Sequence, residues 1–360
     1  MSRPSALAEA TDARIAFTVA DELSATEPPE ARALARDEVR LLVAEPGGIH
    51  HLLFRDIDRV LRPGDLLVVN TSATVASATD GVRADGRSVV VHFSSPVDGD
   101  DPAWIVELRR PDGKGPVRDA AAGERIRLPG SASLTLLAPQ AVRGNRLWHA
   151  RVEADGGVAD LLERWGRPIT YGYRQGRWPL DAYQTVFAGE PGSAEMPSAA
   201  RPFTDRLVTR LVSAGVLFAP VRLHTGVSSL EAGEFPPAER CRVSESTADL
   251  VNHVRAVGGR VVAVGTSATR ALETVARDDG TVGAVEGWTD LVLGPDRRAR
   301  IVDGLVTGWH SADASHLALL EAVAGRPLVE AAYAAALEAG YRWHEFGDSC
   351  LFLPHRHPDR

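Results

Sequence analysis

Residues 260–270 combine an apolar strand, a sharp turn and the start of a helix. The turn consists of Gly265, Thr266 and Ser267, and Arg270 follows one helical turn later. Backbone amides at a helix N-terminus attract anions, so these four residues are candidates to hold a carboxylate or a phosphate. The simpler alternative is that Thr266 or Ser267 only caps the helix. No Gly-x-Gly-x-x-Gly pattern follows a strand, so nothing indicates a dinucleotide site.

Two of the eleven histidines follow apolar runs that are typical of buried strands. His224 comes directly after the run 217–223, and His310 closes a second such run. Ligands of α/β proteins gather at the carboxyl ends of strands, so both are candidates for proton transfer. The alternative is a structural role for each histidine. We expect Glu245 and Asp303 to act as polar partners, and no motif or histidine pair indicates a bound metal.

The stretch 164–178 is rich in arginine and aromatic side chains and contains no acidic residue. Arginine planes and aromatic rings together are typical of surfaces that stack on bases and neutralise phosphates. The alternative is a loop whose aromatic side chains pack into the core while its arginines point to solvent. The candidate RNA-binding residues are Arg164, Arg167, Arg174, Arg177 and Trp178.

The composition bounds the class of protein. The 360 residues include 40 basic and 48 acidic side chains, for a net charge of -8, and 44% are hydrophobic. This indicates a globular protein with two domains, or one large domain with an insertion, and disfavours one that coats nucleic acid without specificity. The single lysine, Lys114, lies outside any phosphate-loop motif, and Cys241 and Cys350 are too few for a disulfide framework. Without a long apolar run or a secretory signal pattern, we expect a cytoplasmic protein that does not enter a membrane.

The elements that must position these residues change in type along the chain. Helix and strand patterns alternate near both ends, which predicts an α/β layer. Between them, short alternating runs separated by turn residues predict a small antiparallel barrel or sandwich. We therefore expect the main domain to comprise residues 1–79 and 156–360, with an inserted β domain at 80–155. The predicted helices cover residues 51–61, 203–214, 246–257, 267–275, 315–324 and 328–339.

A series of short motifs runs in one order along nearly the whole chain. In sequence order they include Arg36-Asp37, Leu61-Arg62-Pro63-Gly64-Asp65, Tyr183-Gln184-Thr185-Val186-Phe187-Ala188, Leu223-His224, Ala263-Val264-Gly265-Thr266, Gly287-Trp288-Thr289-Asp290 and Val302-Asp303-Gly304-Leu305. Through them the chain resembles the S-adenosylmethionine:tRNA ribosyltransferase-isomerase family of the queuosine pathway. Each motif alone is weak evidence, but their common order is specific.

The resemblance implies both a fold and a reaction. The fold is a barrel-like α/β main domain with an inserted small antiparallel β-barrel. S-adenosylmethionine is then a co-substrate: its sulfonium acidifies the C5′ hydrogens, a base removes one, and the ribosyl group moves to a 7-deazaguanine base of tRNA. Adenine and methionine leave as epoxyqueuosine forms, and no metal is required. Tyr183 and Gln184 would orient S-adenosylmethionine beside the turn at Gly265.

The chain departs from the family pattern at five polar positions. Thr71, Ala73 and Ala78 stand where the family has one acid and two arginines, and Pro202 and Val243 stand where it has histidines. Two functions therefore remain open, a tRNA-modifying transferase and a diverged enzyme that uses S-adenosylmethionine on a small-molecule acceptor. The arginine-aromatic stretch favours the first, and the net charge and the lost residues favour the second. The sequence predicts no oligomeric state.

Overall fold

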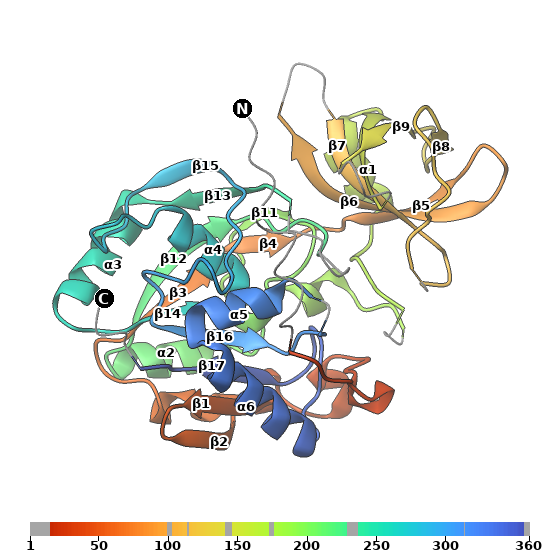
Figure 1. The fold of residues 1–360 in the computed structure, drawn as a ribbon. Helices are drawn as coiled ribbons and strands as arrows, with labels where there is room; N and C mark the ends of the chain where they lie inside the picture. Colours follow the sequence, from red (N-terminus) through yellow and green to blue (C-terminus); the bar gives the residue numbers. More distant parts are fainter. Residues whose placement is uncertain are drawn as a thin grey trace.

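The chain folds into a large sheet flanked by helices and a separate small barrel (Figure 1). The computed structural model describes residues 15–98, 103–113, 115–140, 146–172, 176–228, 237–312 and 314–355. In Figure 1 the barrel stands beside the main body and is joined to it through β4, β11 and the segments around them. The expected α/β class with an inserted antiparallel β-barrel is confirmed.

Nine strands form the main sheet, and its centre is parallel. Strand β3 lies between β12 and β14, β14 also pairs with β16, and all three pairings are parallel. The carboxyl ends of these four strands therefore meet at one edge of the sheet. In spatial order the strands are β15 (Val285–Thr289), β13 (Glu239–Val243), β12 (Leu217–Leu223), β3 (Leu66–Asn70), β14 (Val261–Val264), β16 (Gly304–Gly308), β17 (Ser349–Phe352), β1 (Arg40–Glu45) and β2 (Gly48–Leu53).

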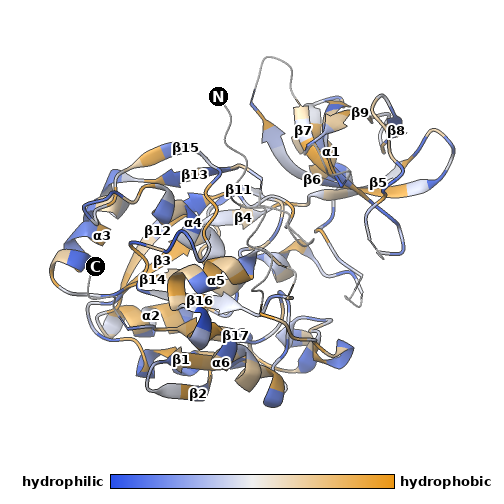
Figure 2. Cartoon of the chain, in the orientation of Figure 1, coloured by the Kyte–Doolittle hydropathy of each residue, from blue (hydrophilic) through white to orange (hydrophobic). Residues whose placement is uncertain are grey.

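Alternating side chains of the central strands supply two separate cores. Leu67 and Val69 of β3 belong to one core, and Leu66 and Val68 belong to the other. This period of two is expected for a strand that is buried on both faces, and Figure 2 shows the central strands as apolar. The first core contains α2 (Asp205–Ser213), and the second contains residues of α3 (Glu245–Ala256), α4 (Thr266–Thr274), α5 (His316–Ala324) and α6 (Arg326–Glu338).

Local capping explains where two of these helices begin. The backbone N–H of Leu207 donates to Thr204 Oγ1 at 3.1 Å at the start of α2. The backbone N–H of Thr247 donates to Ser244 Oγ at 3.2 Å at the start of α3. Each bond satisfies one amide that has no partner within the helix. All five helices predicted beyond residue 200 are found, and each begins and ends within two residues of its expected bounds.

The prediction of a helix at residues 51–61 is wrong. Residues 48–53 form β2, which pairs antiparallel with β1, so that Leu52 lies opposite Leu41. Residues 54–59 then form a short 3-10 helix, in which Phe54 and Ile57 are buried. The helix-like apolar spacing arose because a half-buried edge strand passes directly into this turn. The other short 3-10 segments are Asp21–Leu23, Pro29–Arg32, Arg36–Glu38, Leu180–Tyr183 and Ser198–Ala200.

The inserted barrel has six strands and its own apolar core. Every neighbouring pair is antiparallel. Helix α1 (Gly157–Trp165) packs Leu161 and Leu162 against this core. Its strands run from residue 78 to residue 153, and a separate domain with bounds 80–155 stays a prediction. In order around the barrel they are β10 (Leu147–Glu153), β7 (Ala103–Arg109), β6 (Ser88–Val97), β5 (Ala78–Val82), β8 (Arg125–Arg127) and β9 (Ser133–Pro139).

A two-stranded parallel sheet lies at the start of the insertion. It is formed by β4 (Ser72–Thr74) and β11 (Glu190–Ser193), which precede and follow the barrel in the chain. The Val227 N–H also donates to Ser94 Oγ of the barrel at 2.9 Å. The barrel is therefore fastened to the main body beside the carboxyl edge of the central strands.

Candidate functional site

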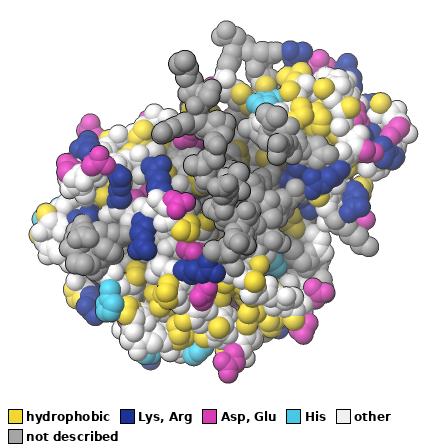
Figure 3. Space-filling model, viewed as in Figure 1, with side chains coloured by type: hydrophobic (Ala, Val, Ile, Leu, Met, Phe, Trp, Pro, Cys, Tyr) yellow, Lys and Arg dark blue, Asp and Glu magenta, His cyan; other side chains and the backbone are white. Residues whose placement is uncertain are grey.

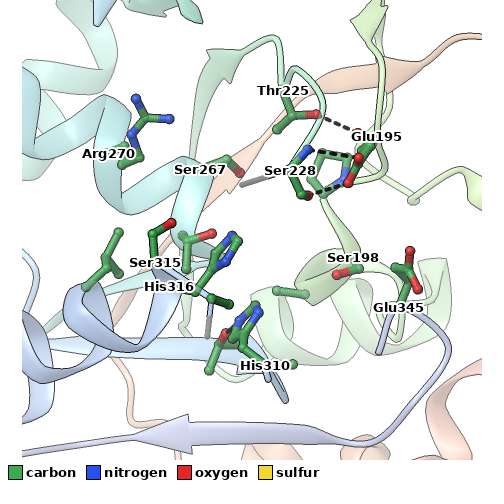
Figure 4. Close-up of a pocket in the computed structure, with 18 of the residues that line it drawn as sticks. Glu195, Ser198, Thr225, Ser228, Ser267, Arg270, His310, Ser315, His316 and Glu345 are labelled. Carbon is green, nitrogen blue, oxygen red and sulfur yellow. Dashed lines mark hydrogen bonds between the residues drawn. The ribbon is translucent and has the colours of Figure 1, made fainter. Parts of the chain in front are cut away.

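A cavity of about 210 Å³ opens at the carboxyl edge of the central strands (Figure 4). Strand β14 leads into it through Gly265, and strand β16 leads into it through Thr307 and Gly308. Its polar wall is contributed by side chains from several separate segments. These side chains are Tyr171, Glu195, Ser198, Thr225, Ser228, Glu239, Thr266, Ser267, Arg270, Thr307, His310, Ser311, Ser315, His316, His344 and Glu345.

The N-terminus of α4 forms one side of the cavity. Gly265 adopts a φ of 93°, a region that glycine occupies without strain, and this lets β14 turn sharply into the helix. No side chain caps α4, and the residues at its start, Gly265, Thr266 and Ser267, line the cavity. The alternative that Thr266 or Ser267 only caps the helix therefore has no support in this geometry. An uncapped helix start carries partial positive charge and suits an anionic group.

Asn70 holds this wall in position. Its Nδ2 donates to the Leu223 carbonyl at 2.8 Å and to Ser267 Oγ at 3.2 Å. Its Oδ1 accepts hydrogen bonds from the Leu223 and Ser72 backbone amides. The buried amide thus joins the ends of β3 and β12 to the first turn of α4.

Arg270 lines the cavity but is occupied by protein partners. Its guanidinium pairs with the Glu239 carboxylate, and its Nε donates to the Leu291 carbonyl at 3.0 Å. Glu239 also accepts a hydrogen bond from the Gly226 amide at 2.8 Å. Burial raises the pKa of Glu239, and the charge of Arg270 opposes that effect. This buried pair shapes the wall between α4 and β13, so direct contact of Arg270 with a carboxylate would require it to share its guanidinium.

Two histidines stack inside the cavity. The rings of His310 and His316 are parallel within 2° and their centroids are 4.3 Å apart. His310 Nε2 lies 3.0 Å from Thr307 Oγ1. Burial lowers the pKa of His310 well below its ordinary value, and the neighbouring His316 and His344 lower it further. Burial, with Arg270, lowers the pKa of His316 to about 4, so both rings are neutral near pH 7.

A third group of polar residues lies across the cavity from Arg270, as Figure 4 shows. The Glu195 carboxylate accepts hydrogen bonds from the Tyr171 hydroxyl, from the Ser228 amide at 2.9 Å and from the Ser228 hydroxyl at 2.5 Å. The Thr225 hydroxyl donates to the Glu195 carbonyl. On its other side Ser228 accepts a hydrogen bond through its carbonyl from the barrel residue Arg146 at 3.0 Å. This wall is therefore held by both parts of the molecule.

Three of the residues expected to take part in catalysis lie outside the cavity. His224 Nδ1 is 2.7 Å from Ser72 Oγ, and any side chain at Gly192 would collide with its ring. Asp303 precedes β16, at the opposite end of that strand, where it accepts a hydrogen bond from the Val261 amide at 2.9 Å. Glu245 is exposed at the start of α3. The structure therefore does not bring these three residues together with His310.

Tyr183 and Gln184 also hold structure near the cavity and do not line it. The Tyr183 ring packs against Phe346, with centroids 5.3 Å apart. The Gln184 side chain both accepts from the Thr74 amide at 3.0 Å and donates to the Thr74 carbonyl at 2.8 Å. This pair of hydrogen bonds holds the Gln184 side chain against Thr74, the last residue of β4.

The arginine-aromatic stretch is only partly free to meet a ligand. Arg167 pairs with Asp80 at 2.5 Å, and Arg164 lies 3.7 Å from Asp160. Arg177 is exposed, and Trp178 packs against a small cluster that includes Tyr183, Met196 and Phe346. Arg174 lies outside the described residues. On the face in Figure 3, basic and acidic side chains are intermixed. Arg222 with Glu190 is one ion pair among the described residues.

The five positions that depart from the family pattern are absent from the cavity wall. None of Thr71, Ala73, Ala78, Pro202 and Val243 is among the described residues that line it. In the same described ranges, no group of three His, Cys, Asp or Glu side chains is placed to hold a metal ion. None of the described helices is long and apolar enough to cross a membrane.

Several cavity residues could not be found by reading the sequence. Tyr171, Glu195, Ser228 and Glu345 come from segments without a catalytic motif, and they meet only through the tertiary fold. His316 gave one weak signal, because it is a histidine at the start of a predicted helix. His344 has a φ of 71°, an uncommon conformation for a residue with a side chain, and this places it beside the cavity.

These features define a two-part α/β protein with a polar cavity at the carboxyl edge of its main sheet and a barrel fastened beside it. A family model described as "Queuosine biosynthesis protein" matches residues 13–352, and the chain belongs to this family. The relatives found are named as enzymes, and the chain is an enzyme of the same family.

Named relatives match over nearly their full length. A protein of Symbiobacterium thermophilum named S-adenosylmethionine:tRNA ribosyltransferase-isomerase is 36% identical over 349 residues, covering 94% of this chain and 98% of that protein. One of the same name from Gloeobacter violaceus is 33% identical and covers 94% of each chain. The crystal structure of S-adenosylmethionine tRNA ribosyltransferase from Thermotoga maritima is similar with a TM-score of 0.52 and 28% identity, covering 94% of this chain and 99% of that one.

Proposed function

We propose that this enzyme transfers and isomerises the ribosyl group of S-adenosylmethionine onto a 7-deazaguanine base of tRNA, releasing adenine and methionine as epoxyqueuosine forms. Full-length similarity to proteins named for this transfer supports the proposal. The observation that carries it in this chain is the cavity, where the uncapped start of α4 faces a pair of neutral histidines.

The start of α4 suits the carboxylate of the methionine portion. The amides after Gly265 and the hydroxyls of Thr266 and Ser267 can donate to that group while Arg270 remains paired with Glu239. The carboxylate would thereby be placed without breaking a buried ion pair.

His310 is the residue we assign to proton transfer. It is the one histidine among the two expected candidates that lines the cavity, and its lowered pKa keeps the imidazole neutral and able to accept a proton. Thr307 orients the ring through Nε2. We assign supporting roles outside the cavity to His224, Glu245, Asp303, Tyr183 and Gln184.

For the tRNA acceptor, we propose that Arg164, Arg167, Arg174, Arg177 and Trp178 belong to its contact surface. The exposure of Arg177 supports this assignment. A small-molecule acceptor is the second candidate function. The pairing of Arg167 with Asp80 favours it, because a neutralised arginine attracts phosphate less strongly.

The deciding experiment supplies S-adenosylmethionine together with tRNA that carries the 7-deazaguanine precursor. We expect adenine and methionine to appear in equal amounts, with a matching mass increase on the tRNA base. Calorimetric titration of S-adenosylmethionine alone tests the donor site, and no binding at millimolar ligand would overturn the proposal. Adenine release that requires a small-molecule extract, with no tRNA binding at low salt, would select the second function.

A further inference from the structure

Glu195 is a cavity carboxylate without a cationic partner. Its two oxygens accept three hydrogen bonds, one from Tyr171 and two from Ser228, all of them from uncharged groups. Among the described residues no arginine, lysine or histidine forms an ion pair with it. By contrast, two buried acids near this wall have cationic partners: Glu239 pairs with Arg270, and Glu107 pairs with Arg109 and Arg146.

The groups around Glu195 leave its charge uncompensated. Tyr171 and Ser228 are neutral, and the stacked His310 and His316 are neutral near pH 7. Burial of Glu195 raises its pKa, and the charge of Glu345, a second acid on the cavity wall, raises it further. A carboxylate that is removed from water without a counter-charge is costly, unless a ligand brings the counter-charge.

The position of Glu195 relative to α4 gives the cavity two electrically different sides. Figure 4 shows Glu195 and Glu345 on the side away from Arg270 and Ser267. The α4 side favours an anion, because the helix start is uncapped. The Glu195 side favours a cation, because the Glu195 carboxylate lines it and accepts hydrogen bonds only from uncharged groups. A ligand that carries both a negative group and a positive group matches this arrangement.

We propose that Glu195 is the anionic anchor for a positively charged group of the ligand, an ammonium or a sulfonium. The inference rests on the proposed function, since S-adenosylmethionine carries both of these cations and one carboxylate. The Tyr171 and Ser228 donors hold the carboxylate at the cavity wall, and they leave it with lone pairs that can accept from a ligand. Glu195 is therefore a binding residue that selects for a cationic ligand.

The test compares three ligands that share the adenosine portion. S-adenosylmethionine has the sulfonium and the ammonium, S-adenosylhomocysteine has only the ammonium, and methylthioadenosine has neither. We expect E195Q to bind S-adenosylmethionine about ten- to a hundredfold more weakly than the unaltered enzyme, the range expected for a lost charged hydrogen bond. Its affinity for methylthioadenosine should stay within about threefold. An equal loss for S-adenosylhomocysteine identifies the ammonium as the anchored group, and no loss there identifies the sulfonium.

Two further variants separate charge from structure. E338Q makes the same change at an exposed residue at the end of α6 and should leave all three affinities unchanged. S228A keeps the Glu195 charge and removes one of its donors, so it should retain a preference for S-adenosylmethionine over methylthioadenosine. If E195Q weakened all three ligands equally, or none of them, Glu195 would not be a cation anchor. If the unaltered enzyme bound no S-adenosylmethionine, the proposed function itself would fail, which is a distinguishable result.

Discussion

The imidazole rings of His310 and His316 lie face to face in the cavity, with centroids 4.3 Å apart. Two protonated rings at this distance would repel each other, and burial lowers the pKa of both. His316 Nδ1 is buried and has no hydrogen-bond partner among the described residues. The stack therefore opposes protonation of both rings at once, which has consequences for acid stability and for catalysis.

Replacing His316 by Asn should flatten the acid side of the stability profile. Between pH 6.5 and about 4 the unfolded chain binds a proton at His316 that the folded chain does not bind. The free energy of unfolding therefore falls as pH falls through this window, by up to about 1.4 kcal/mol per pH unit from this residue. Urea unfolding at pH 7, 6 and 5 should show a smaller loss in H316N. The exposed H253N serves as control, and parallel profiles for H316N and the unaltered enzyme would contradict the prediction.

Replacing His310 by Ala should slow adenine release from S-adenosylmethionine by about a hundredfold or more, as expected when a proton-transfer group is lost. H224A should stay within about threefold, because His224 contacts Ser72 and lies outside the cavity. Single-turnover assays with saturating tRNA measure both variants. The assignment would be refuted if H310A kept its activity or if H224A lost more.

Replacing Arg270 by Met should destabilise the protein by about 3–5 kcal/mol, because the partner Glu239 would keep a buried charge without compensation. The double variant R270M/E239Q should recover part of that loss. Denaturant unfolding measures both. For comparison, R300M breaks an exposed pair with Asp278 and should cost no more than about 1 kcal/mol. A loss of that small size for R270M would show that the buried pair is not needed for stability.

Reversing Arg174 and Arg177 to Glu should weaken tRNA binding and reduce its dependence on salt. Each phosphate contact adds roughly one unit to the slope of log affinity against log salt, so the slope should fall by about two. Filter binding from 50 to 200 mM salt measures this, and S-adenosylmethionine affinity should be unchanged. R59E, on the 3-10 helix of residues 54–59, is the matched control, since its side chain is 71% exposed. An unaltered slope would remove this stretch from the RNA surface.

Limited proteolysis should release the barrel as one resistant fragment. The six strands close on themselves around their own core, and α1 covers part of it. Cuts are expected before β5 and after α1, where the chain passes between the two parts. Mass spectrometry of the early fragments tests the expected domain bounds, and early cuts within the paired strands of the barrel would contradict a separate domain.

Local chemistry explains why much of the fold could be predicted. Thr204 and Ser244 cap the helices that follow them, and the apolar run ending at Val264 leads through Gly265 into α4 as expected. The edge strand at residues 48–53 escaped prediction because its spacing of apolar residues also fits a helix. Such local patterns specify elements, and short capping bonds specify their ends.

Only part of the site could be predicted, because the sequence indicates strand ends but not long-range contacts between segments. Position at a strand end indicated His310, which lines the cavity. The same argument indicated His224, but the hydrogen bond to Ser72 and the close approach of Gly192 hold that side chain outside the cavity. Asp303 lies at the start of its strand and not at the end. Glu195 and Ser228 contact each other through long-range packing, and no periodicity or motif in either segment predicts that contact.

The hydrogen bond from Arg146 to the Ser228 carbonyl joins the barrel to the very residue that holds Glu195. The Val227 amide is tied to Ser94 of the barrel in the same way. A rotation of the barrel about its junction would carry this wall with it and change the distance between Glu195 and the start of α4. Such a rotation would change the width of the cavity, and a large molecule bound across both parts would act on that width from outside.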